Sequence, residues 1–207
     1  MKEFKIPTIS FASSSAIYGD LGDVKLTEDI GPLFPISNYG AMKLASEAAI
    51  SSYLESYIEK AFIFRFPNVI GIPATHGVIF DFINKLKLNP DYLEVLGDGT
   101  QQKTYLHVEE LIDAMIFIRK YSKEKINYFN IGANDNGASV KFIAEEVVKN
   151  VSSRAIIKYG KGHKGWVGDV PKFTYSIDKL TSLGWQSNLT SLESVKKAIK
   201  EIIENYS

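Results

Sequence analysis

The stretch Tyr39-Gly40-Ala41-Met42-Lys43 opens the most strongly helical run of the sequence. Pro35 lies just outside it, and Ser37 or Asn38 is available as the N-cap residue. Apolar residues then recur at helical and not strand spacing, at Met42, Ala45, Ala49, Ile50, Tyr53, Leu54, Tyr57 and Ile58. The pattern therefore predicts a helix over residues 38–59.

Tyr39 and Lys43 are four residues apart, so both project from one face of this helix. An ammonium beside a phenol stabilises the phenolate, which makes Tyr39 a candidate general acid or base. The same spacing also arises by chance. In that case Tyr39 is packed at the helix start and Lys43 is a solvated partner of Glu47.

A short apolar strand upstream, residues 8–13, runs into Ser13, Ser14 and Ser15. Sheets of α/β proteins present their catalytic side chains at strand ends. The alternative is a polar turn whose hydroxyls cap the loop. Because Tyr39 and Lys43 follow, the serines are candidates for the same site.

Three motifs in order resemble the extended short-chain dehydrogenase/reductase superfamily: SSSAIYGD at 13–20, P-x-S-x-Y-G-x-x-K at 35–43 and RFPNVIG at 65–71. The nearest likeness is to the UDP-glucose 4-epimerase-like, NAD-dependent nucleotide-sugar epimerase/dehydratase family. The resemblance covers nearly the whole chain. It implies an α/β fold, a Rossmann-like doubly wound sheet with a smaller C-terminal α/β lobe that binds the nucleotide sugar.

The resemblance also implies a division into two parts. Residues 1–71 would belong to the NAD-binding domain, and residues 72–207 mainly to the substrate lobe, with some segments returning to the first domain. A dinucleotide fold needs a glycine-rich turn after its first strand, and none precedes the serine strand. We therefore expect a C-terminal portion that lacks the first βαβαβ half, whether shortened, separately encoded or read from a mis-set start.

In the resembling family, NAD takes a hydride from C4 of a nucleotide-linked sugar, and the transient 4-keto sugar receives it back on its other face. Carried over, Tyr39 is the base, Lys43 its partner, and Ser14 the hydroxyl that bonds the sugar, with Ser15 a substitute if the register slips. NADP is not excluded as the cofactor. The implied cofactor-binding residues are Tyr39, Lys43, Pro67, Ala12 and Ser13.

Substrate-binding residues carried over in the same way are Asn68, Lys103, Asp169, Tyr105 and Val78. Asn68 matches an Asn that contacts the nucleotide diphosphate, although it could simply form a loop turn. Lys103 stands in place of a diphosphate-binding Arg and loses the bidentate fork. Asp169 matches the Asp that meets the UDP ribose, but Trp166 replaces the Arg of that motif. A basic loop offers substitutes for this Arg, or is merely solvated: Lys161, His163 and Lys164.

Composition narrows the functional classes. Lys plus Arg and Asp plus Glu are each 24, so no global field attracts nucleic acid or an anionic membrane. No apolar run approaches the ~20 residues of a membrane span, and no signal peptide opens the chain. Zero cysteines and three scattered histidines indicate no disulfide and no metal site. We expect a cytoplasmic protein, and the resemblance implies a homodimer.

Other functions remain open at this point. Dehydratases of the resembling family carry acidic residues just after the catalytic Ser or Thr, where this chain has Ser15 and Ala16. That favours epimerisation, which the resemblance places at C4 of a UDP-hexose, or reduction of a keto sugar. An amino-acid dehydrogenase of the same superfamily is another alternative. A different class is a non-catalytic fragment that binds nucleotide sugars.

Strand and helix patterns alternate along the rest of the chain, which indicates an α/β fold. Strands are expected over 61–66, 92–96, 103–108, 127–131 and 155–159, and helices over 78–88, 109–121, 139–150, 176–183 and 191–206. We expect Ile112 to face inward in the helix over 109–121, and Leu192 to face inward in the helix over 191–206.

Overall fold

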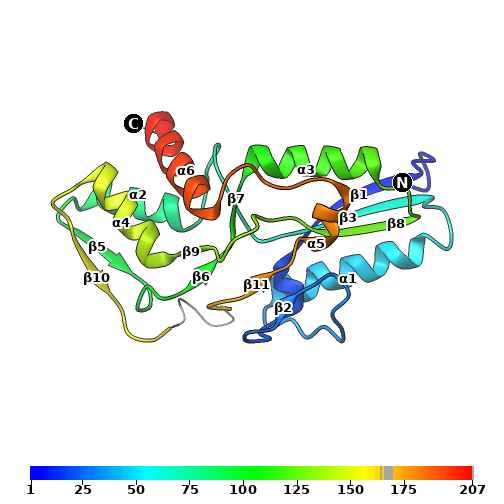
Figure 1. Ribbon diagram of the computed structural model, residues 1–207, viewed down its shortest axis with the longest axis horizontal. Helices are drawn as coiled ribbons and strands as arrows, with labels where there is room; N and C mark the ends of the chain where they lie inside the picture. The colour runs from blue at the N-terminus through cyan, green and yellow to red at the C-terminus, as the bar shows by residue number, and fades with distance from the viewer. Residues whose placement is uncertain (164, 166–169, 207) are drawn as a thin grey trace.

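A three-stranded parallel sheet forms one half of the computed structural model, which describes residues 1–163, 165 and 170–206. Its strands are β1 (Thr8–Ser14), β3 (Lys60–Phe66) and β8 (Ile126–Asn130), in the order β1-β3-β8 (Figure 1). The central strand β3 is buried from Ala61 to Arg65, as expected for a strand covered on both faces.

Two helices cover the faces of this sheet (Figure 1). Helix α1 (Asn38–Tyr53) packs Ile50 on one face against Ala61 and Ile63 of β3. Helix α3 (Val108–Tyr121) packs Leu111, Ala114 and Ile118 on the other face against Phe62 and Phe64. The result is the helix–sheet–helix layering of a doubly wound fold.

Helix α1 differs from the predicted helix over 38–59 in two ways. It ends at Tyr53, and the chain then turns so that Ile58 packs into the core from outside the helix. Its buried face carries Glu47 and Ile50, whereas Met42 and Tyr53 are exposed. The apolar spacing therefore identified part of the buried face, since Ile50, Leu54 and Ile58 are buried, but the carboxylate of Glu47 and not the side chain of Met42 occupies the inward face near the start of the helix.

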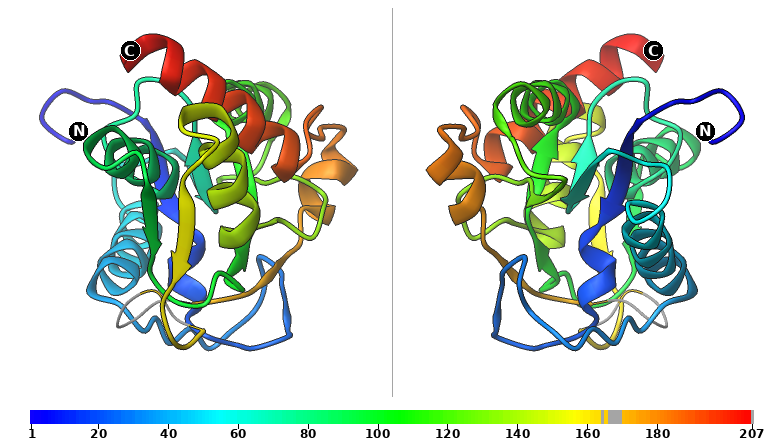
Figure 2. Two further views of the ribbon diagram at one scale, coloured as in Figure 1. Left: turned by 90° about the vertical axis from the view of Figure 1, so that its left-hand side faces the viewer. Right: turned by 90° about the vertical axis from the view of Figure 1, so that its right-hand side faces the viewer.

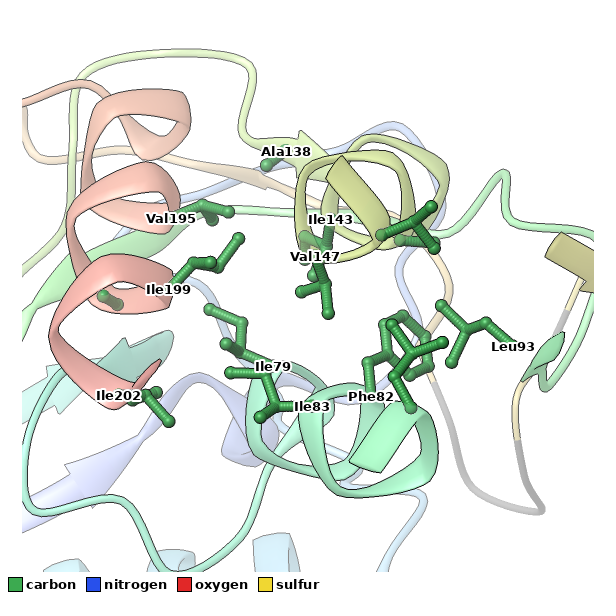
Figure 3. Close-up of a cluster of buried hydrophobic side chains, with 14 of the residues drawn as sticks. Ile79, Phe82, Ile83, Leu93, Ala138, Ile143, Val147, Val195, Ile199 and Ile202 are labelled. Carbon is green, nitrogen blue, oxygen red and sulfur yellow. The ribbon is translucent and has the colours of Figure 1, made fainter. Parts of the chain in front are cut away.

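The second half of the molecule packs three helices around one apolar core (Figure 3). These are α2 (Val78–Leu88), α4 (Val140–Val151) and α6 (Ser191–Tyr206), and Figure 3 shows Ile83, Val147 and Ile199 pointing toward one another. Strand β5 (Tyr92–Val95) adds Leu93 to this core and pairs in parallel with β10 (Ile156–Tyr159).

The stripes of α3 and α6 are largely as expected, with one error in each. Leu111 and Ile118 face inward on α3, but Ile112 is exposed. Val195 and Ile199 face inward on α6, but Leu192 is exposed. Each misplaced residue adjoins the buried stripe, and a step of one residue turns the side chain about 100° around a helix.

Short pairs of strands lie between and beside the two halves (Figure 1; end-on views in Figure 2). Strand β4 (Asn68–Ile70) pairs with β7 (Tyr105–His107), β6 (Gln102–Lys103) with β9 (Ala138–Ser139), and β2 (Lys25–Leu26) with β11 (Thr174–Tyr175). A 3-10 helix, η1 (Ser15–Tyr18), follows β1, and α5 (Asp178–Leu183) contacts β8. None of the described helices combines the length and apolar character needed to cross a bilayer.

Candidate active site

A cavity of about 670 Å³ lies where the ends of β1 and β3 meet the start of α1, β4 and α2. Two sides of it differ in character. Ser14 and Tyr39 contribute hydroxyl groups, and the far wall is apolar, with Ile79, Phe82 and Ile202 shared with the core of the second half. A pocket of this kind, apolar with a few convergent polar groups, suits a small-molecule ligand.

Most of the residues expected to bind substrate or cofactor, or to act on the substrate, line this cavity: Ser14, Tyr39, Pro67, Asn68, Val78, Lys103 and Tyr105. The remaining expected residues that the structure describes do not line it: Ala12, Ser13, Ser15 and Lys43. Asp169 lies outside the described residues, as do Trp166 and Lys164. The structure thus gathers residues from β1, α1, the β3–β4 junction, α2, β6 and β7.

The way α1 begins holds Tyr39 close to the serine turn, which comprises the end of β1 and η1 (residues 13–18). Ser37 is the N-cap, and its side chain accepts a hydrogen bond from Gly40 N at 3.1 Å. A Cβ at Gly40 would lie 2.4 Å from the carbonyl oxygen of Ala16, so only glycine permits this approach of helix and turn. Tyr39 itself remains 56% exposed.

Lys43 bonds to the strand that carries the serines. Its Nζ donates a hydrogen bond of 2.7 Å to the carbonyl oxygen of Ala12, and lies 5.5 Å from the centre of the Tyr39 ring. The alternative interpretation, a solvated Lys43 paired with Glu47, is wrong. Glu47 is buried and pairs with Arg65 instead.

This Arg65–Glu47 ion pair joins β3 to α1. Arg65 Nη2 lies 2.6 Å from Glu47 Oε2, and Arg65 Nε donates to both carboxylate oxygens at 3.1 and 3.2 Å. Ser13, fully buried, donates its hydroxyl to Glu47 Oε1. Arg65 Nη1 donates to the Glu28 carbonyl at 2.8 Å and to the Tyr18 hydroxyl at 3.1 Å. The charges are therefore paired and hydrogen-bonded, as buried charges must be.

Burial also sets the protonation of the groups around the pair. Burial raises the pKa of Tyr18 to about 12, despite the opposing Arg65 charge, and raises the pKa of Glu28. Burial by itself would lower the pKa of Arg65, but its hydrogen bonds to Glu47 and the charges nearby outweigh that effect and raise it. Arg65 is thus a fixed cation at neutral pH.

Residues 1–132 match the family model described as the NAD dependent epimerase/dehydratase family. The chain belongs to this family. The matched range contains the serine turn, the Tyr39–Lys43 pair and the strand that carries Arg65. The expectation of this family, and of an α/β Rossmann-like fold, is confirmed.

Individual relatives agree with this assignment. A putative UDP-glucose 4-epimerase of Methanocaldococcus jannaschii is 28% identical over 210 aligned positions, covering 99% of this chain and 66% of that protein. The solved structure of a UDP-galactose 4-epimerase is 33% identical, with a TM-score of 0.87, covering 100% of this chain and 66% of that one. The structure of MoeE5 in complex with UDP-glucose and NAD is 26% identical, with a TM-score of 0.83, covering 100% and 68%. The chain thus spans just under two thirds of the first curated relative.

The start of α1 fits the nicotinamide-ribose end of the NAD that this epimerase/dehydratase family uses. An ammonium has three donors, and Lys43 donates one to Ala12, so the others can meet ribose hydroxyls. The glycines at 160, 162 and 165 have the spacing G-x-G-x-x-G and follow β10, but the next described helix begins only at Asp178. The described residues 170–177 contain no helix, so the described part of the chain shows no strand–turn–helix unit of the kind that binds a dinucleotide diphosphate.

Three residues of this family member that shape the site were not among the predicted site residues: Gly40, Glu47 and Arg65. Glu47 follows Tyr39 and Lys43 at the same four-residue interval, which places all three along one side of α1. Arg65 is a charge inside the apolar strand KAFIFRF. A buried charge requires a partner, so this pattern indicated that Arg65 has one, but not that the partner is Glu47.

Proposed function

We propose that this chain supplies the nucleotide-sugar site and the proton-transferring residues of an NAD-dependent epimerase that inverts C4 of a UDP-hexose. The observation that carries the proposal is the cavity where Ser14 and Tyr39 meet Asn68 and Lys103. A phenol and a hydroxyl beside an amide and an ammonium provide proton transfer next to an anion-binding group.

Tyr39, Ser14 and Lys43 each have a distinct role in the proposed reaction. Tyr39 takes the proton from the oxygen on C4 of the sugar and later returns it. Ser14 Oγ accepts a hydrogen bond from Ala16 N at 3.2 Å, which leaves its own proton to donate to the same sugar oxygen. Lys43, bonded to Ala12, holds its ammonium 5.5 Å from the centre of the Tyr39 ring.

The proposed cofactor is NAD, with NADP as the alternative, held by Tyr39, Lys43, Pro67, Ala12 and Ser13. Interconversion through a 4-keto sugar needs a hydride acceptor and donor at C4, and NAD supplies this when bound. Inversion also requires the keto sugar to turn in the site, for which the cavity of about 670 Å³ leaves room.

The proposed substrate residues divide by chemistry. Asn68 and Lys103 meet the diphosphate, because an amide and an ammonium both donate to phosphate oxygens. Tyr105 and Val78 contribute to the walls around the nucleotide and the sugar. Asp169 is proposed for the ribose by its position in the sequence motif alone. A UDP-hexose is supported by the similarity to a UDP-galactose 4-epimerase and to MoeE5, whose structure contains UDP-glucose and NAD.

A sugar-nucleotide 4,6-dehydratase is the second candidate, because the family description names both chemistries. Loss of water needs an additional acid close to the reacting sugar. Among the described residues that line the cavity, the carboxylate is Asp81, and its Oδ2 lies 2.8 Å from Lys85 Nζ. This argues for epimerisation.

The test is incubation with UDP-glucose and NAD, followed by NMR of the sugar products. The expected result is UDP-galactose from the wild type and its formation at least about 10²-fold slower in Tyr39→Phe. A 4-keto-6-deoxy sugar would instead identify a dehydratase. Binding of both UDP-glucose and NAD without any product would identify a non-catalytic binding fragment and overturn the catalytic proposal.

The proposal extends to assembly, location and domain division. We propose a homodimer through the exposed side of α1, where Met42 and Tyr53 are exposed and the two charged residues of the helix are engaged elsewhere. Sedimentation equilibrium of the wild type and of Met42→Lys tests it, with a monomeric wild type as the contrary result. A cytoplasmic location and the domain boundary between residues 71 and 72 stay predictions.

A further inference from the structure

Side chains that do not line the cavity hold together the elements that form its wall. Lys43 and Glu47 follow Tyr39 at successive turns of α1 and both reach β1. Lys43 bonds the Ala12 carbonyl, and Glu47 receives the Ser13 hydroxyl. Two consecutive residues of β1 are therefore tied to α1 immediately before Ser14.

Arg65 adds the third element to this arrangement. It forms three hydrogen bonds to the Glu47 carboxylate and precedes Phe66 and Pro67, which line the cavity. Since β3 is the neighbour of β1 in the sheet, with Ser13 paired in register with Arg65, the same two strands are joined by backbone and by side chains. The Glu47 carboxylate thus joins α1 to both β1 and β3, close to where these three elements reach the cavity.

We infer that Glu47, Arg65 and Ser13 are positioning residues that fix the distance and orientation between Ser14 and Tyr39. The inference rests on the proposed function only in assigning Ser14 and Tyr39 to the sugar. Catalytic groups must be held to within about 0.5 Å, and rotamers locked by hydrogen bonds behind the site achieve this.

A purely structural role makes a different prediction from a positioning role. Removing Glu47 or Arg65 leaves an unpaired buried charge, which can unfold the whole chain and so reveals nothing about the site. Ser13→Ala is sharper, because it removes only the link from the ion pair to β1 and leaves Arg65 and Glu47 paired. Ser10→Ala is the matched control, since this serine of β1 bonds Arg119 at 2.6 Å and does not line the cavity.

Amide hydrogen exchange of the whole chain distinguishes the two roles. A hydrogen bond to a buried carboxylate changes a local opening equilibrium about tenfold or more. In Ser13→Ala we expect exchange at least about tenfold faster at residues 14–16 and 38–43, with the rest of the chain unchanged. Ser10→Ala should leave both segments as in the wild type. Equal acceleration throughout the chain, or the same local effect in both variants, would overturn the inference.

A second readout follows Tyr39 directly. Fluorotyrosine is incorporated throughout, and the Tyr39 resonance is assigned in the ¹⁹F spectrum by its loss in Tyr39→Phe. Ser13→Ala should shift or broaden this resonance, and Ser10→Ala should not; an unmoved resonance in Ser13→Ala counts against positioning. Calorimetry with UDP-glucose on the wild type is run in parallel. Its failure would count against the proposed function, while the exchange and ¹⁹F results would still decide the inference.

Discussion

Lys43 donates a hydrogen bond of 2.7 Å from Nζ to the backbone carbonyl of Ala12, thereby joining the start of α1 to the end of β1. The bond places the ammonium 5.5 Å from the Tyr39 ring centre. One side chain thus serves two purposes: it fixes the helix against the strand and keeps a positive charge next to the phenol.

Tyr39→Phe removes the proposed proton-transfer group and little else. We expect the epimerisation rate to fall about 10²- to 10⁴-fold, the range typical of general acid–base catalysis, with UDP-glucose affinity within about twofold of the wild type. Tyr53→Phe is the matched control, because Tyr53 lies exposed at the far end of the same helix and does not line the cavity. Equal rates for the two variants would remove Tyr39 from the mechanism.

Gly40→Ala reverses the usual effect of alanine in a helix. Intrinsic propensity favours alanine over glycine by about 1 kcal/mol. The new Cβ would nevertheless lie 2.4 Å from the backbone oxygen of Ala16, and backbone cannot move away cheaply. We expect Gly40→Ala to lower the melting temperature, whereas Gly31→Ala, with nothing within 4 Å of the new Cβ, should not. A Gly40→Ala variant as stable as the wild type would show that α1 and the serine turn are not closely packed.

Glu28 should make stability depend on pH. Burial raises the pKa of its carboxyl, so the folded state holds this proton at pH values where the unfolded state has released it. Stability contributed by this group is therefore lost as pH rises from the ordinary glutamate range, about 4.3, through the raised folded-state pKa.

Glu28→Gln tests this sign, because the amide oxygen can still accept the 2.9 Å hydrogen bond from Asn130 N. The variant should gain melting temperature relative to the wild type at pH 7 but not at pH 4. Glu124→Gln, at an exposed glutamate, should show the same difference from the wild type at both pH values. A Glu28→Gln effect independent of pH would contradict the assignment of the penalty to the buried charge.

Leu86→Ala and Leu88→Ala delete the same atoms from one helix in two environments. Leu86 is 1% exposed in the core of the second half and Leu88 is 87% exposed. We expect Leu86→Ala to cost about 2–5 kcal/mol of unfolding free energy in urea denaturation, the range for buried leucines, and Leu88→Ala less than about 0.5 kcal/mol. Similar values for both would mean that α2 does not pack as described.

The ends of secondary-structure elements were predictable where a residue with a clear backbone effect stood at the boundary. Helix α2 runs from Val78 to Leu88 as expected, because Gly77 precedes it and Asn89-Pro90 follows. Helix α1 had no such stop signal: apolar spacing continues to Ile58, which reaches the core through a turn instead.

The site was predictable for residues that act on a ligand and not for residues that act on other residues. Ser14, Tyr39 and Asn68 belong to recognisable motifs and line one cavity. Glu47 and Arg65 bond each other, and that pairing depends on how α1 lies across β3, which no local pattern encodes. Their burial is a property of tertiary structure.

The central claim is that the cavity lined by Tyr39 and Lys103 binds a UDP-sugar, and calorimetric titration of this chain with UDP-glucose tests it most directly. NAD is titrated separately. We predict saturable binding of UDP-glucose at one site, with a dissociation constant between about 1 μM and 1 mM, the usual range for enzyme substrates. Absence of binding by UDP-glucose across that range would contradict the claim.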